Sequence, residues 1–263
     1  MRGIQANCSP RCGVVYLNRI GTSTRAVPIS RGSSEPRSGF KWRSSTLQLR
    51  QMDPSGNRET RLNLLQAAGE VFAEHGFRRA TVREICSRAG ANIAAVNYHF
   101  GDKQKLYASV LQHWLGEALR KYPPEGGLPA DAPPEQKLRA FVRSFLFRML
   151  GEGTPAWHGR LMAREMSEPT AAFDLILAET ARPMSQRLNA VVRDLLGPHA
   201  SDHAVRNCAM SVAGQCCFYR HAHEMIRRLY PDMQHTPDQI EQLSDHITQF
   251  SLAAIETFRK SLR

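Results

Sequence analysis

The segment from Thr81 to Phe100, TVREICSRAGANIAAVNYHF, constrains the fold more than any other part of the chain. It contains two short stretches with apolar residues at helical spacing, separated by Gly90. Because glycine readily adopts the positive φ angles of a sharp turn, the segment predicts two helices joined by a tight turn. The outward face of the second helix lacks the usual lysines and glutamates and carries instead Ala94, Ala95, Asn97 and Tyr98.

The flanking segments complete a small helical unit over residues 58–118. An amphipathic pattern over residues 58–76 predicts a first helix that ends at Gly76, with Leu62, Leu65, Ala68 and Phe72 at helical spacing. Thr81 and Glu84 have the spacing of a capping box, and Asn92 and Asp102 are suited to cap the next two helices. The second and third helices are expected to bury Val82, Ile85, Cys86, Ala89, Ile93, Val96 and Phe100.

Helices joined by such a turn form a helix-turn-helix, whose second helix enters the major groove of DNA. Small side chains at Ala94 and Ala95 would let the helix approach the base edges, and Asn97 suits an adenine edge. Tyr98 and His99 can donate to phosphates, and Lys103 adds positive charge near a helix N-terminus. The alternative is a packing module with no DNA-binding role, since a three-helix fold alone does not imply function.

The stretch TRLNLLQAAGEVFAEHGFRRATVREICSRAGANIAAVNYHFGDKQKLYASVL resembles the N-terminal DNA-binding domain of the TetR family of bacterial regulators. The stretches NIAAVNYHFG and REMSEPT are similar to the CecR subgroup. The resemblance implies phosphate contacts by Thr81, Tyr98, His99 and Lys103, and base contacts from Asn92 to Asn97. The full predicted DNA-binding set is Thr81, Arg83, Asn92, Ala94, Ala95, Asn97, Tyr98, His99 and Lys103. Many members have Gly, Thr and Tyr where this chain has Ala94, Ala95 and Asn97, which allows a different operator.

Residues 135–263 predict a second, larger helical unit after a loop rich in proline and glycine, GGLPADAPPEQ. All its patterns are helical, and Pro183 is expected to kink or split the third helix. Methionine and aromatic side chains on these patterns suit either a plain core or a pocket for an apolar or aromatic effector. The predicted pocket residues are Phe141, Phe145, Met149, Met162, Phe173 and Met184.

Two long helices are expected at the end of the chain, over about 201–230 and from Pro237 onward. Thr236 and Gln239 have the spacing of a reciprocal cap, and the final helix repeats apolar residues at 3-4 spacing, which is typical of a helix-packing seam. Such a seam can dock on its own bundle or on a second copy, and the resemblance implies a homodimer. The predicted interface residues are Val212, Cys216, Tyr219, Leu243, Ile247, Phe250 and Ala254.

The net charge of +11 is weak evidence for DNA binding by the folded part of the chain, because most of it lies in the N-terminal segment. Residues 1–51 hold nine basic residues and one acid, a net charge of +8, which leaves only +3 for residues 52–263. We predict a disordered basic tail over residues 1–57 because it lacks any helical or strand period. Three interpretations of this tail stay open: translation beginning at Met52, a basic arm that attracts phosphates, and an organelle transit peptide.

Metal chemistry is the main rival hypothesis. Cys217 and His221 lie one helical turn apart, with His203 and His223 nearby, so a helical metal-binding protein is the alternative function. The spacing argues against it, because His221 and His223 point to different faces and the chain contains no C-x-x-C. No G-x-S-x-G, P-loop or dinucleotide motif appears, so neither an enzyme nor a cofactor is expected. The six cysteines are expected to be free thiols in a reducing cytoplasm.

These patterns together predict an all-α protein and a ligand-responsive transcriptional regulator, most simply a repressor. It would bind a palindromic operator in double-stranded DNA as a homodimer, and an effector would release it. No run of apolar residues is long enough for a membrane span, so the expected location is the cytoplasm.

Overall fold

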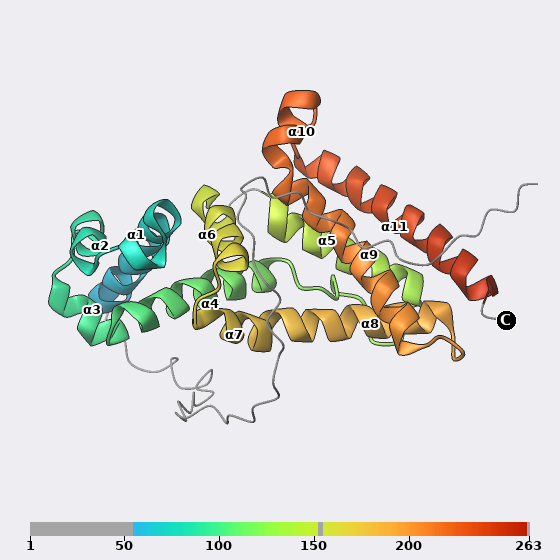
Figure 1. The fold of residues 1–263 in the computed structure, drawn as a ribbon, viewed down its shortest axis with the longest axis horizontal. Helices are drawn as coiled ribbons and strands as arrows, with labels where there is room; N and C mark the ends of the chain where they lie inside the picture. The colour runs from blue at the N-terminus through green and yellow to red at the C-terminus, as the bar shows by residue number, and fades with distance from the viewer. Residues whose placement is uncertain (1–54, 152–154, 262–263) are drawn as a thin grey trace, which may run out of the picture. The chain divides into compact units, whose positions relative to one another are not determined.

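The computed structural model describes residues 55–151 and 155–261, all of which lie in the unit formed by residues 52–263. Within these ranges every regular element is a helix, which confirms the predicted all-α class (Figure 1). The predictions for the basic tail fall almost entirely outside the described residues. Its expected end at residue 57 is wrong, because the first helix already begins at Ser55.

Eleven α-helices follow one another along the described ranges, with short connections between most of them. Their bounds are α1 Ser55–Arg79, α2 Val82–Ala89, α3 Ile93–Phe100, α4 Lys103–Lys121, α5 Pro134–Leu150, α6 Ala156–Ser167, α7 Ala172–Ile176, α8 Arg182–Leu196, α9 Asp202–His221, α10 His223–Leu229 and α11 Pro237–Ser261. One turn of π-helix, Leu177–Ala181, joins α7 to α8, and Pro183 lies in the first turn of α8. The expected interruption near Pro183 is therefore present as this π-helical turn.

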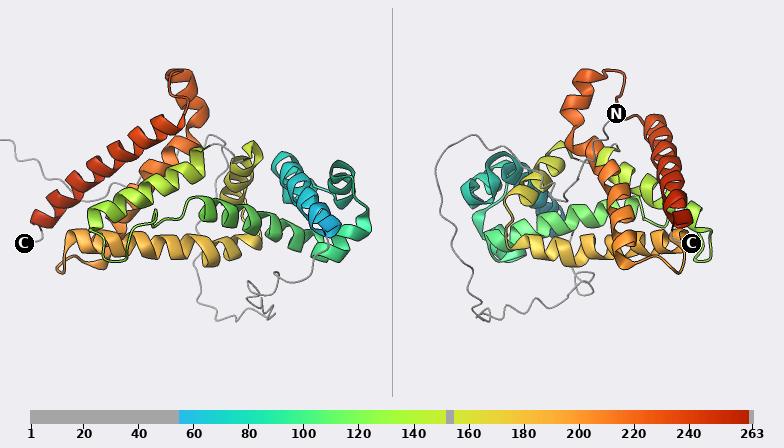
Figure 2. Two further views of the ribbon diagram at one scale, coloured as in Figure 1. Left: turned by 180° about the vertical axis from the view of Figure 1, so that it is seen from behind. Right: turned by 45° about the vertical axis from the view of Figure 1, so that its right-hand side comes forward.

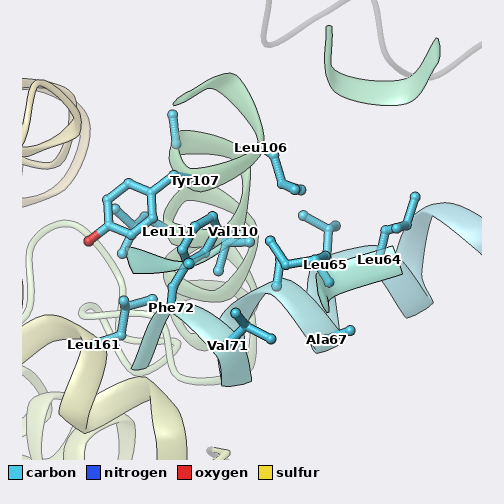
Figure 3. Close-up of a cluster of buried hydrophobic side chains, with 14 of the residues drawn as sticks. Leu64, Leu65, Ala67, Val71, Phe72, Leu106, Tyr107, Val110, Leu111 and Leu161 are labelled. Atoms are coloured by element: carbon cyan, nitrogen blue, oxygen red, sulfur yellow. The ribbon is translucent and has the colours of Figure 1, made fainter. Parts of the chain in front are cut away.

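The first core holds the helix-turn-helix together. Its buried side chains come from α1 to α4, and Phe72 packs edge-on against Tyr107 with ring centroids 4.8 Å apart. The same core includes Trp157 and Leu161 of α6 and residues of α7. Figure 3 shows Leu161 beside Phe72 and the residues of α4. Helices that follow the expected loop thus share the core of the N-terminal helices.

Helix α6 is docked tightly on α1. A Cβ atom added at Gly69 would lie 2.2 Å from the Trp157 ring, so only glycine permits this approach. Arg164 also donates hydrogen bonds to the carbonyl oxygens of Ala73 and Glu74, at 3.1 Å each. These contacts satisfy two carbonyls just before Gly76, where α1 leaves helical geometry (φ 74°, ψ 166°), and they fix α6 against α1.

A buried hydrogen-bond network connects α4, α6 and the start of α7. The Tyr107 hydroxyl donates to Glu165 at 2.5 Å, and Thr170 donates to the same carboxyl group through its backbone N–H and its hydroxyl. Glu165 is fully buried, so these bonds replace the water it loses on folding. Burial and the Glu165 carboxylate both raise the pKa of Tyr107, which keeps the phenol protonated as a donor.

The second core lies among α5, α8, α9 and α11 (Figure 2). It is built from leucine, valine, isoleucine and phenylalanine side chains, and ion pairs at its edge join Arg139 to Asp245 and Arg143 to Glu241. The single long helix expected over 201–230 is wrong, because Ala222 leaves helical geometry (φ −91°, ψ 10°) and separates α9 from α10. Among the described residues no helix is long and apolar enough to cross a bilayer.

Candidate nucleic-acid interface and ligand site

The predicted caps set the turn between α2 and α3. Thr81 accepts a hydrogen bond from the N–H of Glu84 at 3.2 Å, and Asn92 accepts one from the N–H of Ala94 at 3.0 Å. Gly90 ends α2 at a φ of 63°, a left-handed angle that favours glycine. Only half of the predicted capping box forms, because the Glu84 carboxylate pairs with Arg88 instead. Asp102 caps α4 through the N–H of Lys105.

An ion network fixes α2 against α1. Arg88 donates to both carboxylate oxygens of Glu74 at 3.0 and 2.7 Å and to Glu84 at 2.8 Å. His75 lies 3.1 Å from Glu84 on the same face. Bidentate pairing resists rotation of the guanidinium, so the network helps hold the angle between α1 and α2.

The outward face of α3 has the character expected from the sequence. Ala94, Asn97 and Tyr98 are all exposed at i, i+3, i+4 spacing, and Tyr98 has 75% of its surface free. The predicted burial of Ile93 is wrong, because this side chain is 45% exposed. Ala95 is half-buried and packs against the first core, so its side chain is less accessible than that of the exposed Ala94.

Three other residues of the predicted DNA-binding set, Arg83, His99 and Lys103, differ in burial and contacts. Arg83 is exposed and His99 is half-buried. The Lys103 ammonium donates to the carbonyl oxygen of Ala80 at 2.9 Å and lies 4.7 Å from the centre of the Phe77 ring. Lys103 therefore also ties α4 to the end of α1, a structural role that sequence reasoning missed.

The six predicted pocket residues are distributed over both cores and their surroundings. Phe141, Phe145 and Met184 pack in or against the second core, whereas Met162 packs against the first. Phe173 and Met149 are half-buried elsewhere, and none of the six lines a described cavity. A methionine and aromatic stripe can face either a cavity or neighbouring helices, and four of the six side chains contact one of the cores. A ligand pocket at these residues stays a prediction.

A cavity of about 420 Å³ lies instead among the starts of α1 and α6, the C-terminal half of α4 and the end of α5. Leu62 contributes from α1, Trp114 from α4 and His158 from α6. The Trp114 and Trp157 rings meet edge to face with centroids 5.4 Å apart. Burial lowers the pKa of His158 to about 4, with a smaller effect from Arg220, so this imidazole is neutral at pH 7.

The predicted interface residues divide into three groups according to their burial. Val212, Cys216 and Ile247 are buried in the chain's own second core, so their assignment to a partner-facing surface is wrong. Tyr219 and Leu243 are half-buried against the same core. Phe250 is 61% exposed and Ala254 is exposed, as a partner-facing surface requires.

Large apolar side chains that the prediction did not include are also exposed on α9 and α11, beside the predicted Phe250. The resulting surface contains Met210 and Phe218 on α9, which are 73% and 51% exposed, and Phe250 and Phe258 on α11. A groove lined by Gly214, Phe218 and His246, among others, separates the two helices. The spacings of 8 residues on each helix could have indicated this stripe, but the sequence alone does not say which side the core occupies.

The metal hypothesis gains no support from the described contacts. The His221 ring nitrogen Nδ1 lies 2.9 Å from the backbone carbonyl oxygen of Cys217. This hydrogen bond within the helix engages the nitrogen that a metal ion would need. Among the described residues, the potential ligands that gather in a group of three are Glu74, His75 and Glu84, and Arg88 already neutralises both acids there.

Comparison with protein families matches two parts of the chain. Residues 64–110 match the model described as bacterial regulatory proteins of the tetR family. Residues 134–255 match the C-terminal domain of the HTH-type transcriptional dual regulator CecR.

Relatives and solved structures agree with these matches. The chain is 29% identical over 179 residues to the HTH-type transcriptional dual regulator CecR of Shigella flexneri, covering 64% of this chain and 78% of that one. It is 29% identical over 174 residues to the HTH-type transcriptional repressor NicS of Pseudomonas putida, covering 61% and 75%. A TetR-like transcriptional regulator from Rhodococcus shares the fold at a TM-score of 0.55 and 16% identity, covering 77% of this chain and 99% of the other.

Proposed function

Because this chain belongs to the TetR family of bacterial transcriptional regulators, with a C-terminal domain of the CecR type, we propose how it regulates. It is a ligand-responsive, DNA-binding regulator of transcription. In our proposal it acts in the cytoplasm as a repressor: a homodimer binds a palindromic operator and an effector releases it. One relative is named a repressor and another a dual regulator.

The exposed face of α3 is the observation that carries the DNA-binding part. A bare alanine at Ala94 leaves the helix backbone open to base edges, and Asn97 beside it offers both a donor and an acceptor. Tyr98 stands out from the same face and can donate to a phosphate. The caps at Asn92 and Gly90 fix the turn that precedes α3. Val96 and Phe100 anchor the inner face of α3 in the first core, so its opposite face stays open toward a groove.

Support for a homodimer comes from the apolar stripes on α9 and α11. Large apolar side chains exposed on adjacent helices indicate an interface, because burying each one in water-free contact is favourable. Two copies that meet through the same stripes form a closed, two-fold assembly. Two α3 helices in such a dimer can reach half-sites about one turn of DNA apart.

Effector control follows from a shift between conformations. A ligand moves such an equilibrium only if it binds one state more tightly than the other. Helix α4 belongs to the core of the helix-turn-helix and also lines the cavity, so a ligand there contacts the element that carries α3. The ligand-bound state would hold the two α3 helices at a spacing that no longer fits the operator.

The test is a selection of random duplex DNA by the purified full chain, followed by sequencing of the bound fraction. We expect an enriched motif with two inverted half-sites about 10 base pairs apart or a larger multiple of the helical turn. The variant Ala94→Glu should abolish enrichment, since it adds bulk and negative charge to the groove-facing helix. Ser87→Glu introduces the same charge at another exposed position, on α2, and controls for charge alone. Recovery of unselected sequences by the unmodified chain would contradict the proposal.

A further inference from the structure

The cavity between α1, α4 and α6 has the size of a small-molecule site. Its volume of about 420 Å³ lies within the usual range for ligand pockets, which is roughly 300–1,000 Å³. Leu62, Trp114 and Ala118 provide apolar wall on two helices. This composition suits a flat, largely apolar or aromatic body.

The charged lining of this cavity is predominantly positive. Arg58, Lys121 and Arg148 all line it, whereas Glu117 is the acidic residue of the lining. Glu117 is ion-paired with Arg120 on its own helix, which reduces its negative potential in the cavity. Burial lowers the pKa of Arg148 to about 10, so its guanidinium still carries a charge at neutral pH. The balance therefore attracts an anionic group.

Two residues of the cavity lining carry buried polar atoms that have no hydrogen-bond partner among the described residues. His158 is 9% exposed, and its Nε2 atom has no hydrogen-bond partner among the described residues. The Nε1 atom of Trp114 is also buried and has no hydrogen-bond partner among the described residues. A buried polar atom without a partner costs free energy, and the neutral imidazole can donate or accept according to its tautomer. Both residues line the cavity, so a ligand that displaces the atoms covering these nitrogens would recover this cost.

We propose that this cavity binds a small organic acid with an aromatic body, whose carboxylate lies among Arg58, Lys121 and Arg148. The inference rests on the proposed function, because it names the chemical class of the effector. The acid would contact α1 and α4, which both belong to the helix-turn-helix core, and His158 on α6, which is docked on α1. Occupancy would act directly on the helices that position α3.

A matched pair of probes separates charge from shape. Naphthalene-2-carboxylate and naphthalene-2-carboxamide have nearly the same size, and only the first is anionic. We expect calorimetric titration of the full chain to show the carboxylate binding about tenfold or more tightly than the amide, because the anion gains charge-assisted hydrogen bonds. The double variant Arg58→Gln/Lys121→Gln removes two exposed cavity cations and should lose this preference. Arg182→Gln/Arg206→Gln removes the same charge from exposed positions outside the lining and should keep it.

The position of the site is tested separately. Ala118→Trp fills the wall of the cavity and should abolish binding of both probes, with thermal unfolding as the check that the variant is folded. Equal binding of the two probes, binding of neither, or binding unchanged by Ala118→Trp would each overturn the proposal. The carboxylate, and not the amide, should also release the selected DNA in fluorescence anisotropy. Absence of selective DNA binding before any probe is added would instead contradict the proposed function, and the titrations would still decide the cavity.

Discussion

At the scale of single residues, two neighbouring asparagines of the helix-turn-helix have different tasks. The Asn92 side chain is engaged in capping α3, whereas Asn97 is exposed on its outward face. We expect Asn97→Ala to weaken binding to the selected operator by about 1–3 kcal/mol, the usual value of a bidentate base contact. Binding to random duplexes should barely change, because phosphate contacts dominate there. Fluorescence anisotropy on the two DNAs measures both quantities.

The contrast with Asn92 makes this prediction sharp. Asn92→Ala removes a cap and should destabilise the fold by about 1 kcal/mol, with weaker binding to both DNAs. An equal loss on both DNAs for Asn97→Ala would show that Asn97 is not in contact with bases.

A second residue-scale prediction concerns the buried imidazole of His158. Its pKa is about 4 in the folded protein, below the value of about 6.5 in an unfolded chain. Below pH 6.5 the unfolded state therefore binds an extra proton, and stability is lost as the pH falls from 6.5 toward 4. Relative to His158→Gln, the unmodified chain should lose about 2 kcal/mol of unfolding free energy between pH 7.5 and 5. Urea unfolding at both pH values checks this, and parallel losses would place His158 in contact with water.

At the scale of elements, the docking of α6 on α1 depends on the absence of a side chain at Gly69. Alanine there would collide with the Trp157 ring, and overpacking of this kind costs about 1–3 kcal/mol. The gain in helix propensity is about 1 kcal/mol, so we expect Gly69→Ala to lower the unfolding free energy on balance. Chemical denaturation measures the change.

Gly116 in α4 provides the matched control for this element. A Cβ atom added there meets nothing within 4 Å, so Gly116→Ala should stabilise the protein by about 1 kcal/mol through helix propensity alone. If Gly69→Ala stabilises the chain by the same amount, α6 does not pack on α1 as described.

At the scale of the whole molecule, Phe250 tests the dimer. This side chain is 61% exposed, so Phe250→Glu should leave the chain folded. In a two-fold interface each subunit would lose the burial of one phenylalanine, worth about 1.5–3 kcal/mol apiece, and would bring two carboxylates close together. We expect a monomer in light scattering and no stable operator complex. Leu229→Glu on α10 is 62% exposed outside the stripe and should stay dimeric. A dimeric Phe250→Glu would place the interface elsewhere.

The sequence by itself determined the local structure of this protein. The caps at Thr81, Asn92 and Asp102 and the turn at Gly90 depend on atoms only a few residues apart, so their spacing sufficed to predict them. The reciprocal cap of Thr236 and Gln239 forms for the same reason.

Only the tertiary structure decided which side of each helix meets the core. A 3-4 repeat identifies an apolar stripe but not its neighbour, so Ile247 lies inside the bundle while Phe250, three residues on, stays exposed. The cavity was beyond prediction because Leu62, Trp114 and His158 come from separate helices that meet only in three dimensions. The hydrogen bond from Lys103 to the carbonyl oxygen of Ala80 was equally beyond prediction, because the two residues are 23 positions apart in the chain. Contacts between residues far apart in sequence depend on how whole helices pack, and no local pattern contains that information.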